Sequence, residues 1–221
     1  MLQLQDASRL ADYSALAAEI IRFGHIFYDK GWNLATSSNY SVLLERCPLR
    51  VLMTTSGKHK GELTQSDFVV IDENLQPLDM RVDGYGLAPG KPSAEAGLHV
   101  ELLKRGAGAV LHSHSVWATV ISNHFFSKGY VQFQGYEMLK ALEGVKTHDT
   151  RVRLPIYDNT QDMTTLAAEI GSRLDKGEID HGFLLRGHGL YTWGPTLSDA
   201  RNRLEALEFL LEVTGRSGER V

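Results

Sequence analysis

Two pairs of short apolar segments, one near each end of the chain, have connections too short to contain a helix. The first pair, residues 39–44 and 50–54, is joined by a loop that holds Cys47 and Pro48. The second pair occupies residues 183–193 and is interrupted only by Gly187-His188-Gly189. Parallel neighbours need a crossover of about a dozen residues or more, so each pair is predicted to be antiparallel. These connections argue against an all-parallel, doubly wound sheet.

Segments with helical spacing separate the other predicted strands. We expect helices over residues 8–30, 93–103, 115–123, 137–142, 163–174 and 197–213, and further strands over 68–72, 109–112 and 151–156. Ser8 and Ser93 are the expected N-caps of the first two helices. The predicted fold is α/β, with a central mixed, largely antiparallel sheet and helices on both faces. We expect one domain over residues 1–221, with a core of about 8–213 and a frayed polar tail, 215–221.

Composition excludes several classes of function. The 221 residues are 43% hydrophobic and 23% charged, as in an ordinary globular protein, and the net charge of −4 leaves no basic surface for nucleic acid or an anionic membrane. No apolar stretch approaches the roughly 20 residues of a membrane span, and no signal peptide is recognisable. The single cysteine, Cys47, excludes an internal disulfide and a cysteine-based zinc site. We therefore expect a cytoplasmic protein.

The most informative polar pattern is His112-Ser113-His114, directly after the apolar run of residues 109–111. On a strand His112 and His114 share one face and Ser113 points to the other, so the two imidazoles can bind one metal ion. The pattern alone fits equally well two polar residues that enter a loop. His188, between two glycines after an apolar strand, is the best third ligand. Three imidazoles are typical of a catalytic zinc with an open fourth position, although other divalent transition metals accept them.

Two small polar clusters border the first strand pair, at residues 36–39 and 55–61. Ser, Thr, Gly and Lys side chains and backbone N–H groups in such clusters can bind a phosphate. Neither cluster has the Walker A spacing, and both fit ordinary loops. They are a hypothesis for a site that recognises an anionic small molecule.

Five motifs together carry a family resemblance. They are Thr36-Ser-Ser-Asn-Tyr-Ser41, Thr54-Thr-Ser-Gly57, Lys91-Pro-Ser-Ala-Glu95, His112-Ser-His114 and Arg186-Gly-His-Gly189. In this order, across residues 15–212, they resemble the class II aldolase/adducin family. The resemblance implies one Zn²⁺ per subunit on His112, His114 and His188, and a small sugar-phosphate substrate. It also implies a homotetramer with active sites at subunit interfaces.

Three further segments resemble the branch of this family that dehydrates a sugar phosphate: residues 56–64, 105–110 and 133–140. The resemblance implies a lyase in which one carboxyl group moves protons. Glu95 matches the acid/base glutamate of the family's aldolases, and Glu137 matches that of the dehydratases. We favour Glu137, and Glu95 is then a second carboxylate or a helix-start residue without a catalytic part.

The resemblance also assigns the phosphate. The residues it implies are Ser38, Asn39, Ser56, Gly57 and Ser93, with charge from Lys58 or Lys60. Ala94 stands where the family's aldolases have a second serine, which weakens an aldolase interpretation. The alternatives are an aldolase or pentulose-phosphate epimerase on the same scaffold, and a non-catalytic, adducin-like interaction domain that would need no metal.

Overall fold

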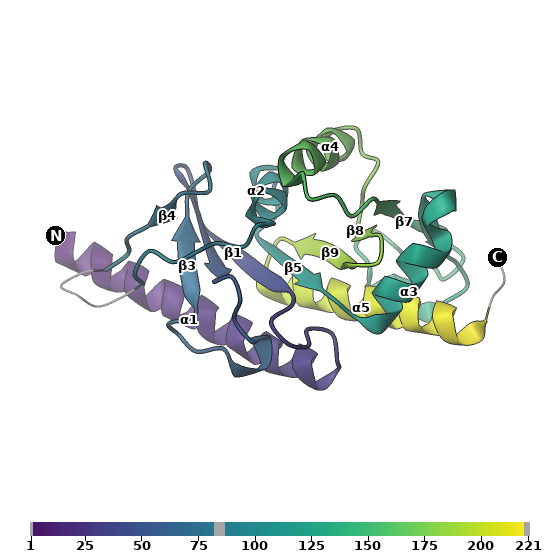
Figure 1. The fold of residues 1–221 in the computed structure, drawn as a ribbon, viewed down its shortest axis with the longest axis horizontal. Helices are drawn as coiled ribbons and strands as arrows, with labels where there is room; N and C mark the ends of the chain where they lie inside the picture. Colours follow the sequence, from purple (N-terminus) through teal and green to yellow (C-terminus); the bar gives the residue numbers. More distant parts are fainter. Residues whose placement is uncertain (1, 82–86, 219–221) are drawn as a thin grey trace.

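The computed structural model describes residues 2–81 and 87–218, and Figure 1 shows their arrangement. The α-helices are α1 (Leu2–Asp29), α2 (Ala96–Lys104), α3 (Val116–Phe125), α4 (Met163–Asp175) and α5 (Leu197–Ser217). The strands are β1 (Asn39–Arg46), β2 (Leu49–Thr54), β3 (Phe68–Ile71), β4 (Pro77–Leu78), β5 (Ala109–Ser113), β6 (Tyr130–Phe133), β7 (Val152–Tyr157), β8 (Gly182–Leu185) and β9 (Gly189–Gly194). Three 3₁₀ helices complete the set: η1 (Lys60–Glu62), η2 (Phe126–Lys128) and η3 (Glu137–Ala141).

The described strands form one sheet in the order β4-β3-β2-β1-β5-β9-β8-β7-β6. All neighbours are antiparallel except β7 and β8, which are parallel because α4 forms the crossover between them. The predicted hairpins are β1–β2 and β8–β9. The prediction of a mixed, largely antiparallel sheet is therefore confirmed.

Helices cover both faces of the sheet, as predicted. α2 and α4 lie on one face, above the sheet in Figure 1, and α1 and α5 lie on the other. Along β5, Val110 belongs to the core under α2 and α4, whereas Leu111 belongs to the core under α1 and α5. This alternation follows from the two-residue period of a strand, and it decides which face each later side chain of β5 occupies.

Two helix starts differ from the prediction. α1 begins at Leu2, so Ser8 is not its N-cap; the preceding residues lack a helix breaker and continue the helix. α2 begins at Ala96, and Ser93 is not its N-cap either. The Ser93 hydroxyl instead accepts the backbone N–H of Glu95 at 3.2 Å, in a turn that precedes the helix.

The C-terminal helix is longer than predicted. α5 continues through Ser217, so residues 215–217 of the predicted frayed tail are helical, and 219–221 lie outside the described residues. A Cβ at Gly215 would lie 2.3 Å from the Trp117 ring, so only glycine lets α5 approach α3 this closely. Across residues 2–81 and 87–218, no helix has the length and apolar character that a membrane crossing requires.

Candidate metal centre and substrate cavity

His112 lies in the centre of the sheet, paired with Asn39 of β1 on one side and with Tyr191 of β9 on the other. Its imidazole is fully buried and stacks on the Tyr191 ring at a centroid distance of 3.9 Å. Ser113 points to the opposite face, where its hydroxyl donates to the Glu208 carboxyl group of α5. The predicted alternation on β5 is therefore present, and the chain beyond β5 brings His114 back beside His112.

His188 reaches the same point from the turn between β8 and β9. Gly187 has a φ of +62°, and a Cβ at Gly189 would lie 2.0 Å from the Ser113 carbonyl oxygen. Both glycines are required, one for the turn and one for the close approach to β5. The three Nε2 atoms are 2.7 Å (His112–His114), 3.1 Å (His114–His188) and 3.3 Å (His112–His188) apart.

The chemistry of this cluster fits a divalent cation. His112 Nδ1 donates to the Leu190 carbonyl oxygen at 2.9 Å, and His188 Nδ1 donates to Asn159 Oδ1 at 3.0 Å. Burial lowers the pKa of all three histidines, to about 4 for His114, so the rings are neutral at neutral pH. In neutral rings held by Nδ1–H, Nε2 carries a free electron pair. The Nε2 atoms of the three histidines converge on one point, and neutral imidazole nitrogens in this arrangement can coordinate a single metal ion.

The two predicted glutamates lie in different places. Glu95, just before α2, lies beside the cluster, with Oε1 3.1 Å from His188 Nε2 and Oε2 3.7 Å from His112 Nε2. Glu137 is the first residue of η3 and is exposed. It pairs with Lys140 at 2.5 Å, and this ammonium lowers the pKa of the Glu137 carboxyl group.

A cavity of about 160 Å³ connects His114 and His188 with both polar clusters. Its described lining consists of Thr36, Ser37, Ser38, Asn39, Thr54, Thr55, Ser56, Gly57, Lys60, Ser93, Glu95, His114 and His188. Six of the seven residues predicted as candidates for the phosphate are among them. Glu137 and Lys58 are not part of this described lining.

Lys60, rather than Lys58, is the cation of this cavity. Lys58 pairs with Asp67 at 2.8 Å. Lys60 is only 1% exposed and donates to the Lys58 carbonyl oxygen at 2.6 Å. Desolvation by the surrounding protein lowers its pKa to about 8. Lys60 therefore remains mostly protonated at neutral pH, and an anion in the cavity would be bound by its ammonium group and would raise its pKa.

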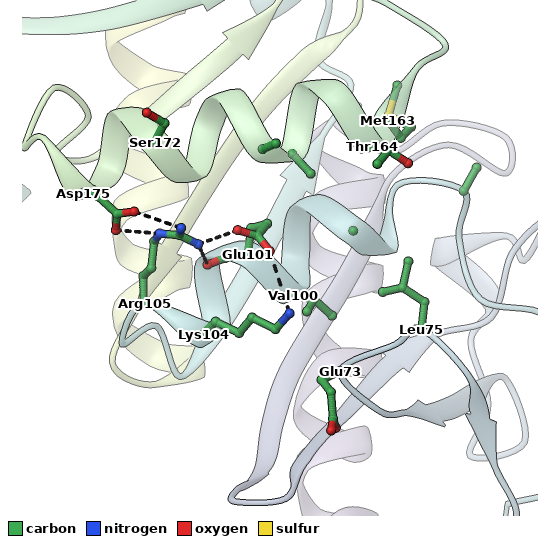
Figure 2. A pocket seen from close by; sticks show the side chains of 14 residues that line it. Glu73, Leu75, Val100, Glu101, Lys104, Arg105, Met163, Thr164, Ser172 and Asp175 are labelled. Atoms are coloured by element: carbon green, nitrogen blue, oxygen red, sulfur yellow. Dashed lines mark hydrogen bonds and ion pairs between the residues drawn. The ribbon is translucent and has the colours of Figure 1, made fainter.

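A wider hollow, of about 580 Å³, lies between α2 and α4 (Figure 2). Its charged side chains largely neutralise one another: Arg105 pairs with Glu101 and Asp175, and Lys104 lies 3.8 Å from Glu101. The smaller cavity, where a buried lysine and several hydroxyl groups border the histidine cluster, is the better candidate for chemistry.

His99 is not among the site residues predicted from the sequence, but the structure places it behind Glu95. His99 Nε2 contacts Asn39 Oδ1, and Asn39 Nδ2 donates to Glu95 Oε2 at 2.6 Å. The available signal was the spacing of four between Glu95 and His99, which puts both on one helix face. The partner Asn39 comes from β1, and only the fold brings it there.

Comparison with known proteins agrees with this geometry. Residues 18–214 match the model of a family described as "Class II Aldolase and Adducin N-terminal domain". The chain belongs to this family. A solved class II aldolase family structure, L-fuculose-1-phosphate aldolase from Thermus thermophilus, superimposes with a TM-score of 0.70 at 23% identity, covering 92% of this chain and 94% of its own. At that identity the likeness shows a shared fold.

Other members of the class II aldolase family are much more similar in sequence. A Pseudomonas fluorescens protein named methylthioribulose-1-phosphate dehydratase is 46% identical over 200 residues, which are 89% of this chain and 90% of its own length. A protein of the same name from Azotobacter vinelandii is 45% identical, over 89% of this chain and 91% of its own length.

Proposed function

We propose that this protein is a metal-dependent methylthioribulose-1-phosphate dehydratase, a hydro-lyase of methionine salvage. The observation that carries the proposal is one cavity lined by Glu95, by Lys60, by several hydroxyl groups and by His114 and His188, two members of the three-histidine cluster. The sequence similarity of this protein to proteins named methylthioribulose-1-phosphate dehydratase, over 89% of the chain, supports this substrate rather than another sugar phosphate.

The reaction removes two groups from neighbouring carbons. A proton leaves the carbon next to the carbonyl group, the hydroxyl group one carbon further leaves as water, and the resulting enol becomes a diketone. His112, His114 and His188 would hold a divalent cation, for which zinc is our candidate. When bound, the cation would supply a Lewis acid next to the carbonyl group, which would stabilise the charge formed on proton loss. The protein must therefore supply a base, an acid and a site for the phosphate.

For the phosphate we propose Lys60 together with Ser38, Ser56 and Gly57. Lys60 replaces Lys58 in this role because the charge of Lys58 is already paired with Asp67. Ser93 stays in the proposal because its own hydroxyl proton remains available to an anion. Asn39 is less suited, since its N–H groups face Glu95 and Ser93.

For the proton transfers we propose both glutamates, in different positions. Glu95 lies at the histidine cluster and can accept a proton from a substrate bound there. Glu137 is exposed in its own chain. We propose that Glu137 of the partner subunit completes each site in a homotetramer and protonates the leaving hydroxyl group.

The direct test is to incubate the purified protein with methylthioribulose 1-phosphate and identify the product. We expect 2,3-diketo-5-methylthiopentyl 1-phosphate, which absorbs in the near ultraviolet once enolised, and no product after treatment with a chelator. A triose phosphate or short aldehyde would instead indicate an aldolase. Absence of turnover in metal-loaded protein would favour the adducin-like, non-catalytic alternative.

A further inference from the structure

The Glu95 carboxylate is the end of a buried chain of hydrogen bonds. Asn39 Nδ2 donates to Glu95 Oε2 at 2.6 Å, and Asn39 Oδ1 contacts His99 Nε2. On the other side of the ring, His99 Nδ1 lies 2.7 Å from Ser41 Oγ. Ser41 and Asn39 both come from β1, whereas His99 and Glu95 lie four residues apart at the start of α2.

The donors in this chain can point in only one direction. A carboxylate only accepts hydrogen bonds, so the amide nitrogen of Asn39 must face Glu95 and its oxygen must face His99. His99 Nε2 must then carry the ring proton. In a neutral ring this leaves Nδ1 as an acceptor, and the Ser41 hydroxyl group donates to it.

Burial keeps the His99 ring neutral. Ser41 and His99 have no exposed surface, and Asn39 is 5% exposed. Desolvation lowers the pKa of His99 to about 3, so the ring carries one proton at neutral pH. The Tyr191 ring packs edge-on against His99 at 5.9 Å and stacks on His112. The Tyr191 ring therefore contacts both the hydrogen-bond chain, at His99, and the histidine cluster, at His112.

We propose that Ser41, His99 and Asn39 are positioning residues, whose one-directional hydrogen-bond chain holds the Glu95 carboxylate beside the three-histidine cluster. Without the chain, Glu95 would be free to rotate away from the substrate. The inference rests on the proposed dehydration, and it makes Asn39 a positioning residue rather than a phosphate ligand.

Two substitutions of His99 separate positioning from packing. In His99→Gln the amide nitrogen can replace Nε2 as the donor to Asn39, whereas His99→Leu removes the donor and leaves a side chain that suits a core. We expect His99→Leu to lower kcat by about 10–100-fold, with KM and metal content unchanged, and His99→Gln to recover most of that loss. His25→Leu, on the exposed side of α1, is the control for loss of an imidazole.

The outcomes are distinguishable. A His99→Leu variant with the kcat of the unmodified protein, or a His99→Gln variant as slow as His99→Leu, would contradict positioning through the Nε2 donor. If the unmodified protein does not dehydrate methylthioribulose 1-phosphate, the proposed function fails instead. Melting temperatures of both variants show whether either one is folded well enough to compare.

A second measurement needs neither metal nor activity. Nitrogen-15 NMR of protein labelled on histidine reports which ring nitrogen carries the proton. We expect one histidine that stays neutral with its proton on Nε2 between about pH 5 and pH 8, and whose signals disappear in His99→Gln. A proton on Nδ1, or protonation of this ring within that range, would overturn the proposed direction of the chain.

Discussion

Two of the three clustered histidines use Nδ1 to stay in place and leave Nε2 free. Leu190 and Asn159 supply the acceptors that hold His112 and His188. Burial keeps both rings neutral, so their free electron pairs persist at neutral pH. At the scale of single residues, the cavity thus combines neutral ligands for a cation with one buried cation, Lys60, for an anion.

Replacing His114 with alanine should abolish metal binding and turnover together. The variant removes the Nε2 atom that lies closest to both other histidines. We expect metal content, measured by mass spectrometry after purification without chelator, to fall from one equivalent per chain to a small fraction. His124→Ala, an exposed imidazole of α3, is the matched control. Stoichiometric metal in His114→Ala would refute the ligand assignment.

Replacing Lys60 with methionine should stabilise the folded protein and lower its activity. Desolvation makes the buried ammonium costly, and methionine keeps the length of the side chain without the charge. We expect the melting temperature to rise by a few degrees while kcat/KM falls, mainly through KM. In the unmodified protein, kcat/KM should decline as the pH rises through about 8, because Lys60 loses its proton there. A pH profile of Lys60→Met that keeps this decline would assign it to another group.

At the scale of elements, β5 links the two layers of the molecule. Its alternation directs His112 to the face under α2 and directs Ser113 to α5, where Glu208 accepts its hydrogen bond. Glu208 is 2% exposed, and desolvation raises the pKa of its carboxyl group to about 7. On the side of β5 opposite the histidine cluster, the strand is therefore joined to α5 by the buried hydrogen bond between Ser113 and Glu208, and the Glu208 carboxyl group is titratable.

Glu208 should make stability fall as the pH rises. Between its ordinary value of 4.5 and about 7, the folded protein keeps the Glu208 proton while the unfolded chain has lost it. The free energy of unfolding therefore decreases across this interval. Glu208→Gln removes the titration, and we expect its melting temperature to change less between pH 5 and pH 8 than that of the unmodified protein. An equal change in both proteins would contradict the raised pKa.

Patterns of local periodicity were sufficient to predict the two hairpins, the mixed sheet and the shared face of His112 and His114. Elements that depend on distant contacts were missed. β6 exists because it pairs with β7, and the last turn of α5 exists because Gly215 fits against Trp117. His99 shows the same limit at the site. A histidine on the apolar face of a helix is typical of a protein core. The proposed role of His99 depends on its contact with Asn39, which lies 60 residues away in the sequence.

At the scale of the whole molecule, the centre of the sheet is where the site forms. β1, β5 and β9 lie side by side, and the start of α2 and the turn before β9 meet at the end of β5. Glu137 lies elsewhere, after β6 at the edge of the sheet. The proposal that Glu137 takes part in catalysis therefore includes the proposal that a second subunit supplies it.

Two inactive variants should complement each other if subunits share the site. Glu137→Gln should retain its metal but lose about 10²–10⁴-fold in rate, the usual effect of removing a general acid or base. When Glu137→Gln and His114→Ala are expressed together, mixed tetramers contain some sites with both groups intact. We expect activity to return to at most about a quarter of normal. Mixed tetramers without activity would contradict a site shared between subunits.

Metal titration of the metal-free protein tests the central claim most directly. Zn²⁺ is added stepwise to protein prepared with chelator, and diketone formation from methylthioribulose 1-phosphate is followed after each addition. We expect the rate to rise in proportion to added zinc and to stop rising at one equivalent per chain. Full turnover in the metal-free protein would contradict a reaction that depends on a cation held by His112, His114 and His188.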